Sequence, residues 1–299
     1  MPSRISRTDL GDLNLFRAIA EAGGFRKAAD ELDMSPSALS HAMRGLEERQ
    51  GVRLFNRTNR SVTLTPAGRD LLGEVQAGLR AIENGLENLN SHRERPAGQL
   101  RLNVLSDAAR LVLAPILADY IIAYPDVHLE VRVDDTMVDI VREGFDAGIR
   151  YGGAVPEDMI ALPLGPDLRW IMVASPDYLA SAPSLQSPGD LRNHRCIGMR
   201  MGNGRLYHWE LERDGEITVL SLDWAVVVNE TILTLELAET GAGISYTLED
   251  RVKLQLENGT LVPVLPEWSF MAPGFQLYYP SRRQLPEALR ALLRMMNGS

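Results

Sequence analysis

The sequence predicts a multidomain chain in which a small, mainly helical domain and a long linker helix precede a two-lobed α/β domain. Three observations support this order. Apolar residues repeat at helical spacing up to about residue 91. Residues 92–98, HRERPAG, form a charged linker that ends in Pro and Gly. From Gln99 onward, short apolar strands alternate with helices. A chain of 299 residues is long enough for two or three domains with sizeable cores.

Charge is unevenly distributed along the chain. Residues 1–95 hold 14 Lys and Arg against 13 Asp and Glu, a balance of +1, whereas residues 96–299 hold 17 against 27, a balance of −10. Within residues 44–69, six Arg stand against Glu47 and Glu48, a local balance of +4. Although the net charge is −9, this local positive field suits a module that approaches a polyanion such as DNA.

Two helices are expected before residue 33. The first covers residues 9–22, ends at Gly23 and presents an apolar stripe of Leu10, Leu13, Phe16 and Ala20. The second covers Phe25–Leu32, where the small pair Ala28-Ala29 allows a close helix crossing. Asp33 follows in a tight turn that requires a left-handed backbone, which Asp tolerates.

A third helix begins at Ser35-Pro36. The Ser35 side chain can accept from a free N–H of the first turn, and Pro36 suits a first position that needs no donor. Helical spacing then gives a buried face of Leu39, Met43 and Leu46, and an opposite polar face of Ser37, Ser40, His41 and Arg44. Small hydroxyls with one His and one Arg let a helix lie in the major groove and contact bases or phosphates. The DNA-binding residues expected from this helix are Ser35, Pro36, Ser37, Ser40, His41 and Arg44. An ordinary helical hairpin with a solvated polar face is the alternative.

A short hairpin should follow this helix-turn-helix, which spans about residues 25–44. Val52 and Leu54-Phe55 resemble one strand, residues 58–61 its turn, and residues 62–64 the returning strand. Beside a groove-bound helix, this wing would bring basic and hydroxyl side chains to phosphates or the minor groove. The expected contacts here are Arg53, Arg57, Thr58 and Arg60. A solvated hairpin without a DNA contact is the alternative.

Thr65-Pro66 marks another helix start, and this helix should run to about residue 91. Its apolar positions are spaced three and four residues apart, as in a coiled-coil seam, and comprise Leu72, Val75, Leu79, Ile82, Leu86 and Leu89. The long helix with polar other faces favours a dimer seam. Packing of the helix on its own domain is the alternative.

The remaining chain reads as strands and helices in alternation, which indicates βαβ units and parallel sheets. Expected strands lie at residues 100–105, 127–133, 147–151, 168–174, 196–199, 207–211, 217–220 and 276–279, and residues 223–229 lead into the next helix. Expected helices lie at residues 106–124, 136–143, 230–240 and 285–296. Arg213-Asp214-Gly215 should form a hairpin turn. The chain should cross between its two lobes near residues 164–168 and 266–274.

Residues 9–68 resemble the winged helix-turn-helix of LysR-type transcriptional regulators. The matching residues are Ala28-Ala29, Leu32, Ser35, Ser37-Ala38, Ser40, Leu46-Glu47, Gly51-Val52, Leu54-Phe55, Arg57, Leu64-Thr65 and Ala67-Gly68. Residues 146–152, 175–179, 190–194 and 277–283 resemble the same family, so the likeness covers essentially the whole chain. Two positions depart from the family pattern: Asp33 replaces a usual Gly, and His41 replaces a common Arg.

This resemblance implies three parts: an all-α winged helix-turn-helix N-terminal domain at residues 8–65, a linker and dimerisation helix at 66–91, and a two-lobed α/β effector-binding domain at 96–299. Lobe I would comprise residues 99–165 and 270–299, and lobe II residues 166–269. The implied function is sequence-specific DNA binding in the cytoplasm, modulated by a small-molecule effector between the lobes. The implied partners are double-stranded DNA, a second copy of the chain in a homodimer or homotetramer, and RNA polymerase.

Strand ends that precede helices should face the cleft between the lobes. Free N–H groups at helix starts suit a carboxylate or phosphate, and Arg150 at a strand end could pair with an anion. The expected effector-binding residues are Ser106, Asp107, Arg150, Tyr151, Arg200, Asn229, Glu230 and Thr231. The alternative for Arg150 is a structural ion pair with Asp134 or Asp135. Because the carboxylates of Asp107 and Glu230 would repel an anion, a zwitterionic or neutral effector is the alternative to an anionic one.

The sequence shows no arrangement that indicates an enzyme, a cofactor or a metal site. Cys-x-x-Cys, His-Glu-x-x-His and Gly-rich phosphate-loop motifs do not occur. Cys196, the single cysteine, is either a redox sensor or a buried, inert thiol, and the latter is favoured. No signal peptide or long apolar span is expected, so no membrane contact is predicted. The competing hypothesis is a solute-binding or enzymatic α/β domain fused to a DNA anchor.

Overall fold

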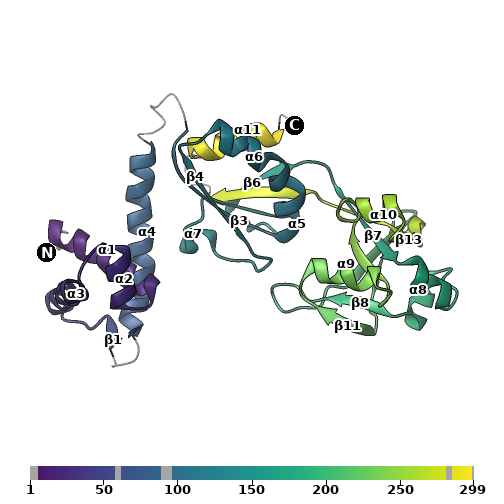
Figure 1. The fold of residues 1–299 in the computed structure, drawn as a ribbon, viewed down its shortest axis with the longest axis horizontal. Helices are drawn as coiled ribbons and strands as arrows, with labels where there is room; N and C mark the ends of the chain where they lie inside the picture. Colours follow the sequence, from purple (N-terminus) through teal and green to yellow (C-terminus); the bar gives the residue numbers. More distant parts are fainter. Residues whose placement is uncertain (1–5, 58–61, 89–95, 281–284, 298–299) are drawn as a thin grey trace. The chain divides into compact units, whose positions relative to one another are not determined.

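The computed structural model describes residues 6–57, 62–88, 96–280 and 285–297. These residues divide into two compact units, one comprising residues 6–57, 62–88 and 141–144 and the other residues 96–140, 145–280 and 285–297 (Figure 1). No helix among the described residues is both long and apolar enough to span a membrane.

The first unit packs three short helices, a two-stranded wing and one long helix. In chain order these are α1 (Arg7–Ala22), α2 (Phe25–Glu31), α3 (Pro36–Gln50), β1 (Phe55–Arg57), β2 (Val62–Leu64) and α4 (Pro66–Asn88). Helix α1 begins two residues earlier than expected, because Ser6 and Asp9 form a capping box. Asp33 has the predicted left-handed backbone, with φ 52°. The first wing strand begins at Phe55 rather than Val52, and 46% of Val52 is exposed.

The core of this unit lies between the three short helices. Its fully buried members include Phe16, Ile19, Ala28, Leu39, Met43 and Leu46, so the apolar face predicted for α3 is buried. Phe55 brings the wing to this core, with its ring centroid 5.3 Å from that of Phe16. Helix α3 and the wing are therefore anchored to one apolar cluster.

Helix α4 uses much of its apolar stripe within its own domain. Val75 is 7% exposed, and Leu72 and Leu79 pack against the same core as α1–α3. Leu72, Val75 and Leu79 therefore pack on their own domain, which was the alternative to a dimer seam. Ile82 differs because 51% of it is exposed. The side chain of Leu86 and all of Leu89 lie outside the described residues.

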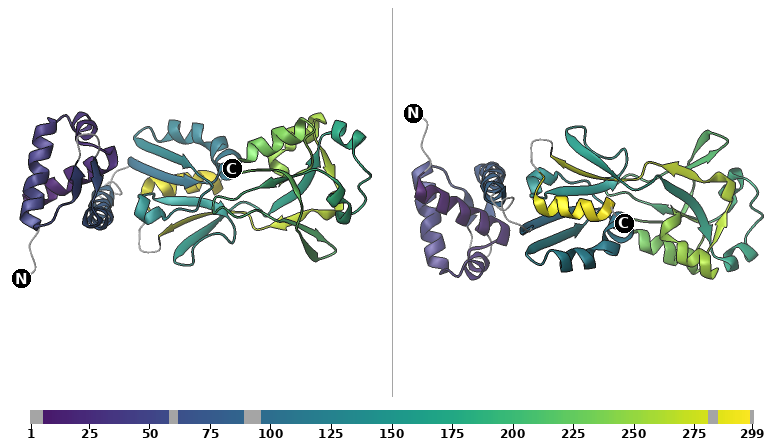
Figure 2. Two further views of the ribbon diagram at one scale, coloured as in Figure 1. Left: turned by 90° about the horizontal axis from the view of Figure 1, so that it is seen from below. Right: turned by 90° about the horizontal axis from the view of Figure 1, so that it is seen from above.

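Lobe I of the second unit is a five-stranded sheet in the order β4-β3-β5-β15-β6. Its elements are β3 (Gly98–Val104), α5 (Ser106–Ala108), η2 (Ala109–Leu113), α6 (Ala114–Ala123), β4 (Val127–Val133), α7 (Ile140–Glu143), β5 (Ala147–Tyr151), β6 (Met159–Leu164), β15 (Phe275–Pro280) and α11 (Glu287–Asn297). Helices α6 and α11 lie side by side against this sheet (Figure 2), and Tyr120 donates to the Ala288 carbonyl at 2.9 Å. The sheet strands β3, β4 and β5 are parallel, as the alternation predicted.

Lobe II is built around β7, which pairs with β12, β13 and β14. Its elements are β7 (Leu168–Ala174), α8 (Pro176–Ser181), η3 (Pro188–Asn193), β8 (Cys196–Met199), β9 (Trp209–Arg213), β10 (Glu216–Leu220), β11 (Trp224–Val228), α9 (Thr231–Glu239), β12 (Ser245–Leu248), η4 (Glu249–Arg251), α10 (Lys253–Asn258), β13 (Val262–Val264), η5 (Pro266–Trp268) and β14 (Phe270–Ala272). The predicted hairpin turn is present, because Asp214 and Gly215 both have positive φ between β9 and β10.

Several details of the second unit differ from the sequence expectations. The helix expected at residues 136–143 is limited to Ile140–Glu143. Strand β14 pairs with β7, so the return to lobe I follows residue 272 rather than residue 269. A π-helical turn, η2, interrupts the helix expected at residues 106–124. Pro115 explains this wider turn, because it lacks the N–H that an α-helical bond to Leu111 requires.

Candidate nucleic-acid interface and effector cavity

The N-terminus of α3 has the local structure that its sequence predicts. The Ser35 side chain accepts from the Ala38 N–H at 3.2 Å, and Pro36 occupies the first helical position. The Ser35 and Ser37 hydroxyls lie 3.0 Å apart, so one hydrogen-bonds to the other. The burial of Leu39, Met43 and Leu46 in the domain core then decides which side chains of α3 face outward.

The polar face of α3 is open to solvent along most of its length. Ser37, His41 and Arg44 are exposed, and Ser40 is half-buried. Arg44 donates from Nη2 to Ser40 Oγ at 3.4 Å, which orients its guanidinium along the helix. These four side chains form the continuous polar face of a helix whose other side is buried, as the docking of a helix in the major groove requires.

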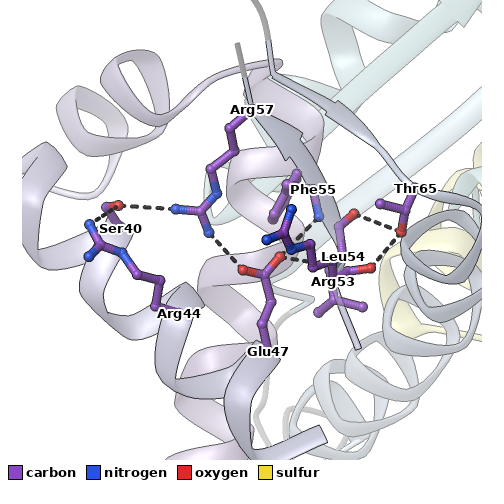
Figure 3. Close-up of polar contacts among 8 residues, drawn as sticks. All are labelled: Ser40, Arg44, Glu47, Arg53, Leu54, Phe55, Arg57 and Thr65. Atoms are coloured by element: carbon purple, nitrogen blue, oxygen red, sulfur yellow. Dashed lines mark hydrogen bonds and ion pairs between the residues drawn. The ribbon is translucent and has the colours of Figure 1, made fainter. Parts of the chain in front are cut away.

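Arg57 on β1 lies against α3 rather than free at the edge of the wing (Figure 3). Its Nη1 donates to Ser40 Oγ at 3.1 Å, and its Nη2 donates to Glu47 Oε2 at 3.0 Å. Its Cζ lies 4.7 Å from the ring centroid of Phe25. The other Glu47 oxygen accepts from the Leu54 and Phe55 N–H groups at 2.8 and 3.1 Å. Glu47 therefore joins the reading helix to the wing.

Thr65 links the start of the wing to the first turn of α4. Its hydroxyl donates to the Arg53 carbonyl at 2.8 Å (Figure 3). The same oxygen accepts from the Gly68 N–H at 3.0 Å. The Arg53 side chain is exposed. Thr58 and Arg60, the other wing residues expected to contact DNA, lie outside the described residues.

Part of the positive charge counted in the sequence is neutralised within the domain. Arg49 pairs with Asp9 at 3.2 Å and also with Asp12, and Arg57 pairs with Glu47. Hydrogen bonds from Ser6 lower the pKa of Asp9, so this partner is a carboxylate at neutral pH. In the described part of the domain, Arg44 and Arg53 have no carboxylate partner. Arg44 on α3 and Arg53 at the start of the wing therefore keep charges that no carboxylate of the described domain neutralises.

A cavity of about 440 Å³ lies between the two lobes of the second unit. Lobe I contributes Asp107 and Thr231 comes from lobe II, so two of the residues expected at the effector site do converge. The remaining lining residues are Arg110, Leu111, Ile232, Leu235, Glu236, Glu239, Arg251 and Gln255. Helices α5 and η2 form one wall, and α9, η4 and α10 form the other.

Asp107 and Arg251 form a buried ion pair across this cavity. Arg251 Nε donates to Asp107 Oδ1 at 2.7 Å, and the Tyr151 hydroxyl donates to Asp107 Oδ2. The side chains of Asp107 and Arg251 are 2% and 9% exposed. Arg251 also donates to Thr247 Oγ1 at 2.9 Å. Sequence reasoning missed Arg251, because its partner is 144 residues away and no local pattern marks it.

Two residues expected to bind the effector are engaged inside lobe I. Ser106 does not cap its helix; its N–H and hydroxyl both donate to the Asp135 carboxylate, at 2.7 and 3.0 Å. Arg150 is 3% exposed and donates to the carbonyls of Asn103, Ile149 and Thr136, so it neither faces an open cleft nor forms the alternative ion pair. Burial lowers the pKa of Arg150. Its expected role as an anion ligand is corrected accordingly.

The other expected effector residues have different environments. The Tyr151 ring packs against Trp170 and Phe275, and its hydroxyl contacts Asp107. Burial raises the pKa of this hydroxyl. Glu230 caps its own helix by accepting from the Ile232 and Leu233 N–H groups at 3.0 and 2.8 Å, which leaves no free anion site at that helix start. Asn229 and Arg200 are exposed, and Arg200 donates to the Gly204 carbonyl at 2.8 Å.

The environment of Cys196 is apolar. The residue is fully buried, and burial raises the pKa of its thiol to about 12, so the thiolate is scarce at neutral pH. Within the described residues, no group of three or more His, Cys, Asp or Glu is placed to hold a metal ion.

A winged helix-turn-helix with an exposed polar reading helix, joined to a two-lobed α/β domain, defines a DNA-binding transcriptional regulator. Two family comparisons specify the class. Residues 10–69 match the bacterial regulatory helix-turn-helix of the lysR family, and residues 93–298 match the LysR substrate binding domain. The chain therefore belongs to the LysR family of transcriptional regulators.

Relatives and solved structures agree with this assignment. The chain is 39% identical over 287 residues to YcaN, an uncharacterised transcriptional regulator of Escherichia coli, covering 96% of this chain and 94% of that one. It is 34% identical over 285 residues to the regulator PgrR of the same species, covering 95% of each. The full-length virulence activator AphB of Vibrio cholerae superposes with a TM-score of 0.67 at 25% identity, covering 97% and 99% of the two chains.

Proposed function

We propose that this regulator binds DNA through the polar face of α3 and its wing, and that a small-molecule effector binds in the cavity between the lobes. For the DNA interface, the support is the open row of Ser37, His41 and Arg44 above a buried apolar face. Arg53 adds a free cation at the start of the wing. Thr58 and Arg60 remain predicted contacts.

The effector site rests on a single observation: Asp107 of lobe I and Thr231 of lobe II line one cavity. A ligand there contacts both lobes, so it can change the equilibrium between lobe arrangements by its difference in affinity for them. Leu111, Ile232 and Leu235 offer it an apolar surface, and Arg110, Glu236 and Glu239 offer charges of both signs.

The active assembly is proposed to be a homodimer through the exposed part of α4, including Ile82, with a homotetramer formed through the effector domains. Two copies place two reading helices on one duplex, as winged and other helix-turn-helix dimers require for two half-sites. The working site is the cytoplasm, where the target DNA lies, and RNA polymerase is a further proposed partner.

The effector site is tested with a thermal-shift screen of amino acids, organic acids and amines against the wild-type chain. Any stabilising compound is then tested on Ile232→Trp, which fills the cavity without changing its charge. The matched control is Leu233→Trp, because Leu233 is 41% exposed and does not line the cavity.

We expect Ile232→Trp to abolish the shift and Leu233→Trp to retain it. Equal stabilisation of both variants would place the effector site elsewhere. The same compounds are titrated against a complex of the wild-type chain with a DNA sequence obtained by selection from a randomised duplex pool. A bound compound that leaves this complex unchanged would argue against a regulatory role.

A further inference from the structure

Glu47 is a fixed carboxylate inside the surface proposed above to bind DNA, and the inference drawn from it rests on that proposed function. It lies seven positions after Ser40 on α3, and its side chain is 14% exposed. Three donors converge on it: the N–H groups of Leu54 and Phe55 on one oxygen, and Arg57 on the other. Because two backbone N–H groups hold the Glu47 carboxylate in place, its second oxygen stays beside the Arg57 guanidinium. The negative charge of Glu47 therefore offsets the positive charge of Arg57.

Arg57 is correspondingly restrained. Its two terminal nitrogens reach Ser40 and Glu47, and its guanidinium lies over Phe25. The side chain is nevertheless 29% exposed, and its remaining N–H groups can still donate. At a distance, the paired charges largely cancel, so Arg57 adds little to the general attraction between the domain and any phosphate backbone.

We propose that Glu47 is a positioning residue for DNA specificity, which holds Arg57 against α3 and thereby limits sequence-independent binding. Non-specific DNA affinity comes almost entirely from cations that neutralise phosphates and release counterions. A tethered Arg57 contributes only to a duplex that brings an acceptor to its fixed position. Specificity increases when a contact is denied to non-target duplexes, and Glu47 keeps Arg57 from contacting their phosphates.

The decisive variant is Glu47→Gln. The glutamine carbonyl can still accept from the Leu54 and Phe55 N–H groups, which preserves the junction between helix and wing. Its amide nitrogen carries only donors, so it cannot hold the Arg57 guanidinium. Glu48→Gln is the matched control: it removes the same charge one residue away on the same helix, from an exposed side chain that does not contact Arg57.

The measurement is the salt dependence of binding of the full-length chain to a mixed-sequence duplex. We expect Glu47→Gln to raise affinity on the order of fivefold at 0.1 M salt and to steepen the log–log slope by about 0.9 for each bound protomer, because one more phosphate is neutralised. Glu48→Gln should leave the slope unchanged. Arg57→Gln should hardly alter the slope of the wild-type chain but should restore the original slope when combined with Glu47→Gln.

Selection from a randomised duplex pool provides the second readout. Glu47→Gln should enrich its preferred sequence on the order of fivefold less per round than the wild type, because the released Arg57 binds all duplexes. An unchanged slope in Glu47→Gln, or an equal change in Glu48→Gln, would overturn the proposal. If Glu47→Gln does not fold, Arg57→Gln alone decides: a slope flattened by about 0.9 would show that Arg57 already neutralises a phosphate in the wild type.

Discussion

Asp107 of lobe I and Arg251 of lobe II are joined by a buried ion pair, with Arg251 Nε 2.7 Å from Asp107 Oδ1. Both residues line the interlobe cavity, and the pair joins two positions that are 144 residues apart in the chain. Any rearrangement of the lobes that opens the cavity must therefore break or shift this contact.

The ion pair makes a measurable contribution to the stability of the effector domain. Asp107→Ala leaves Arg251 buried without its counter-charge, so the free energy of unfolding should fall by about 3–5 kcal/mol. The double variant Asp107→Leu, Arg251→Met should recover most of this loss, because both charges are removed together. Urea unfolding followed by tryptophan fluorescence suits the test, since the four Trp residues all lie beyond residue 169. A single variant as stable as wild type would contradict the assignment.

Two neighbouring positions of α4 distinguish the domain core from the proposed dimer contact. Leu79 packs in the core of the DNA-binding domain, whereas Ile82 is 51% exposed. Leu79→Asp should therefore unfold this domain, and Ile82→Asp should shift the chain toward monomer with its helix content intact, because only the first buries a charge within the protomer. Sedimentation velocity and far-UV circular dichroism distinguish the two results. A fully dimeric Ile82→Asp chain would move the interface away from this part of α4.

Two glycines on α4 should respond in opposite directions to alanine. A Cβ at Gly68 would lie 2.2 Å from the Leu54 carbonyl oxygen, whereas at Gly73 it meets no atom within 4 Å. Gly68→Ala should lower the free energy of unfolding by about 1–3 kcal/mol through this clash. Gly73→Ala should raise the free energy of unfolding by up to about 1 kcal/mol, since alanine is the better helix former. Calorimetric unfolding of the two variants provides the comparison, and equal effects would show that the wing does not pack closely on α4.

Cys196 should be almost unreactive while the chain is folded. Burial raises the pKa of its thiol to about 12, so at pH 8 only about one thiol in ten thousand is ionised. Alkylation by iodoacetamide should be slow in the folded chain and should become fast once urea exposes the thiol. The raised pKa also means that the rate in the folded protein should continue to rise above pH 9. Rapid alkylation of the folded chain at pH 8 would revive the redox-sensor hypothesis.

Local signals predicted the DNA-binding domain well. Ser35-Pro36 fixed the start of α3, the apolar spacing identified Leu39, Met43 and Leu46 as buried, and Asp33 has the expected positive φ. Each of these depends on neighbours within a few residues. The tether between Glu47 and Arg57 was not predicted, because hydrogen-bond pairing across a helix and a strand leaves no periodic trace in the sequence.

The effector domain was predicted less completely for the same reason. The parallel strands followed from the alternation of apolar segments, but Ser106 and Arg150 were expected to face a ligand. Their actual partners, Asp135 and the carbonyls around Asn103, come from separate strands and loops. Helix starts and strand ends show where an anion could bind, but not whether the chain already supplies its own acceptor.

Helix α11 completes lobe I from the end of the chain. Leu289 and Leu292 are fully buried in the same core as β3, which begins almost two hundred residues earlier. During translation, the DNA-binding domain therefore emerges with all its core residues long before the sensor can close its first lobe. A chain without α11 would retain every core residue of the first unit but would leave the apolar core of lobe I uncovered.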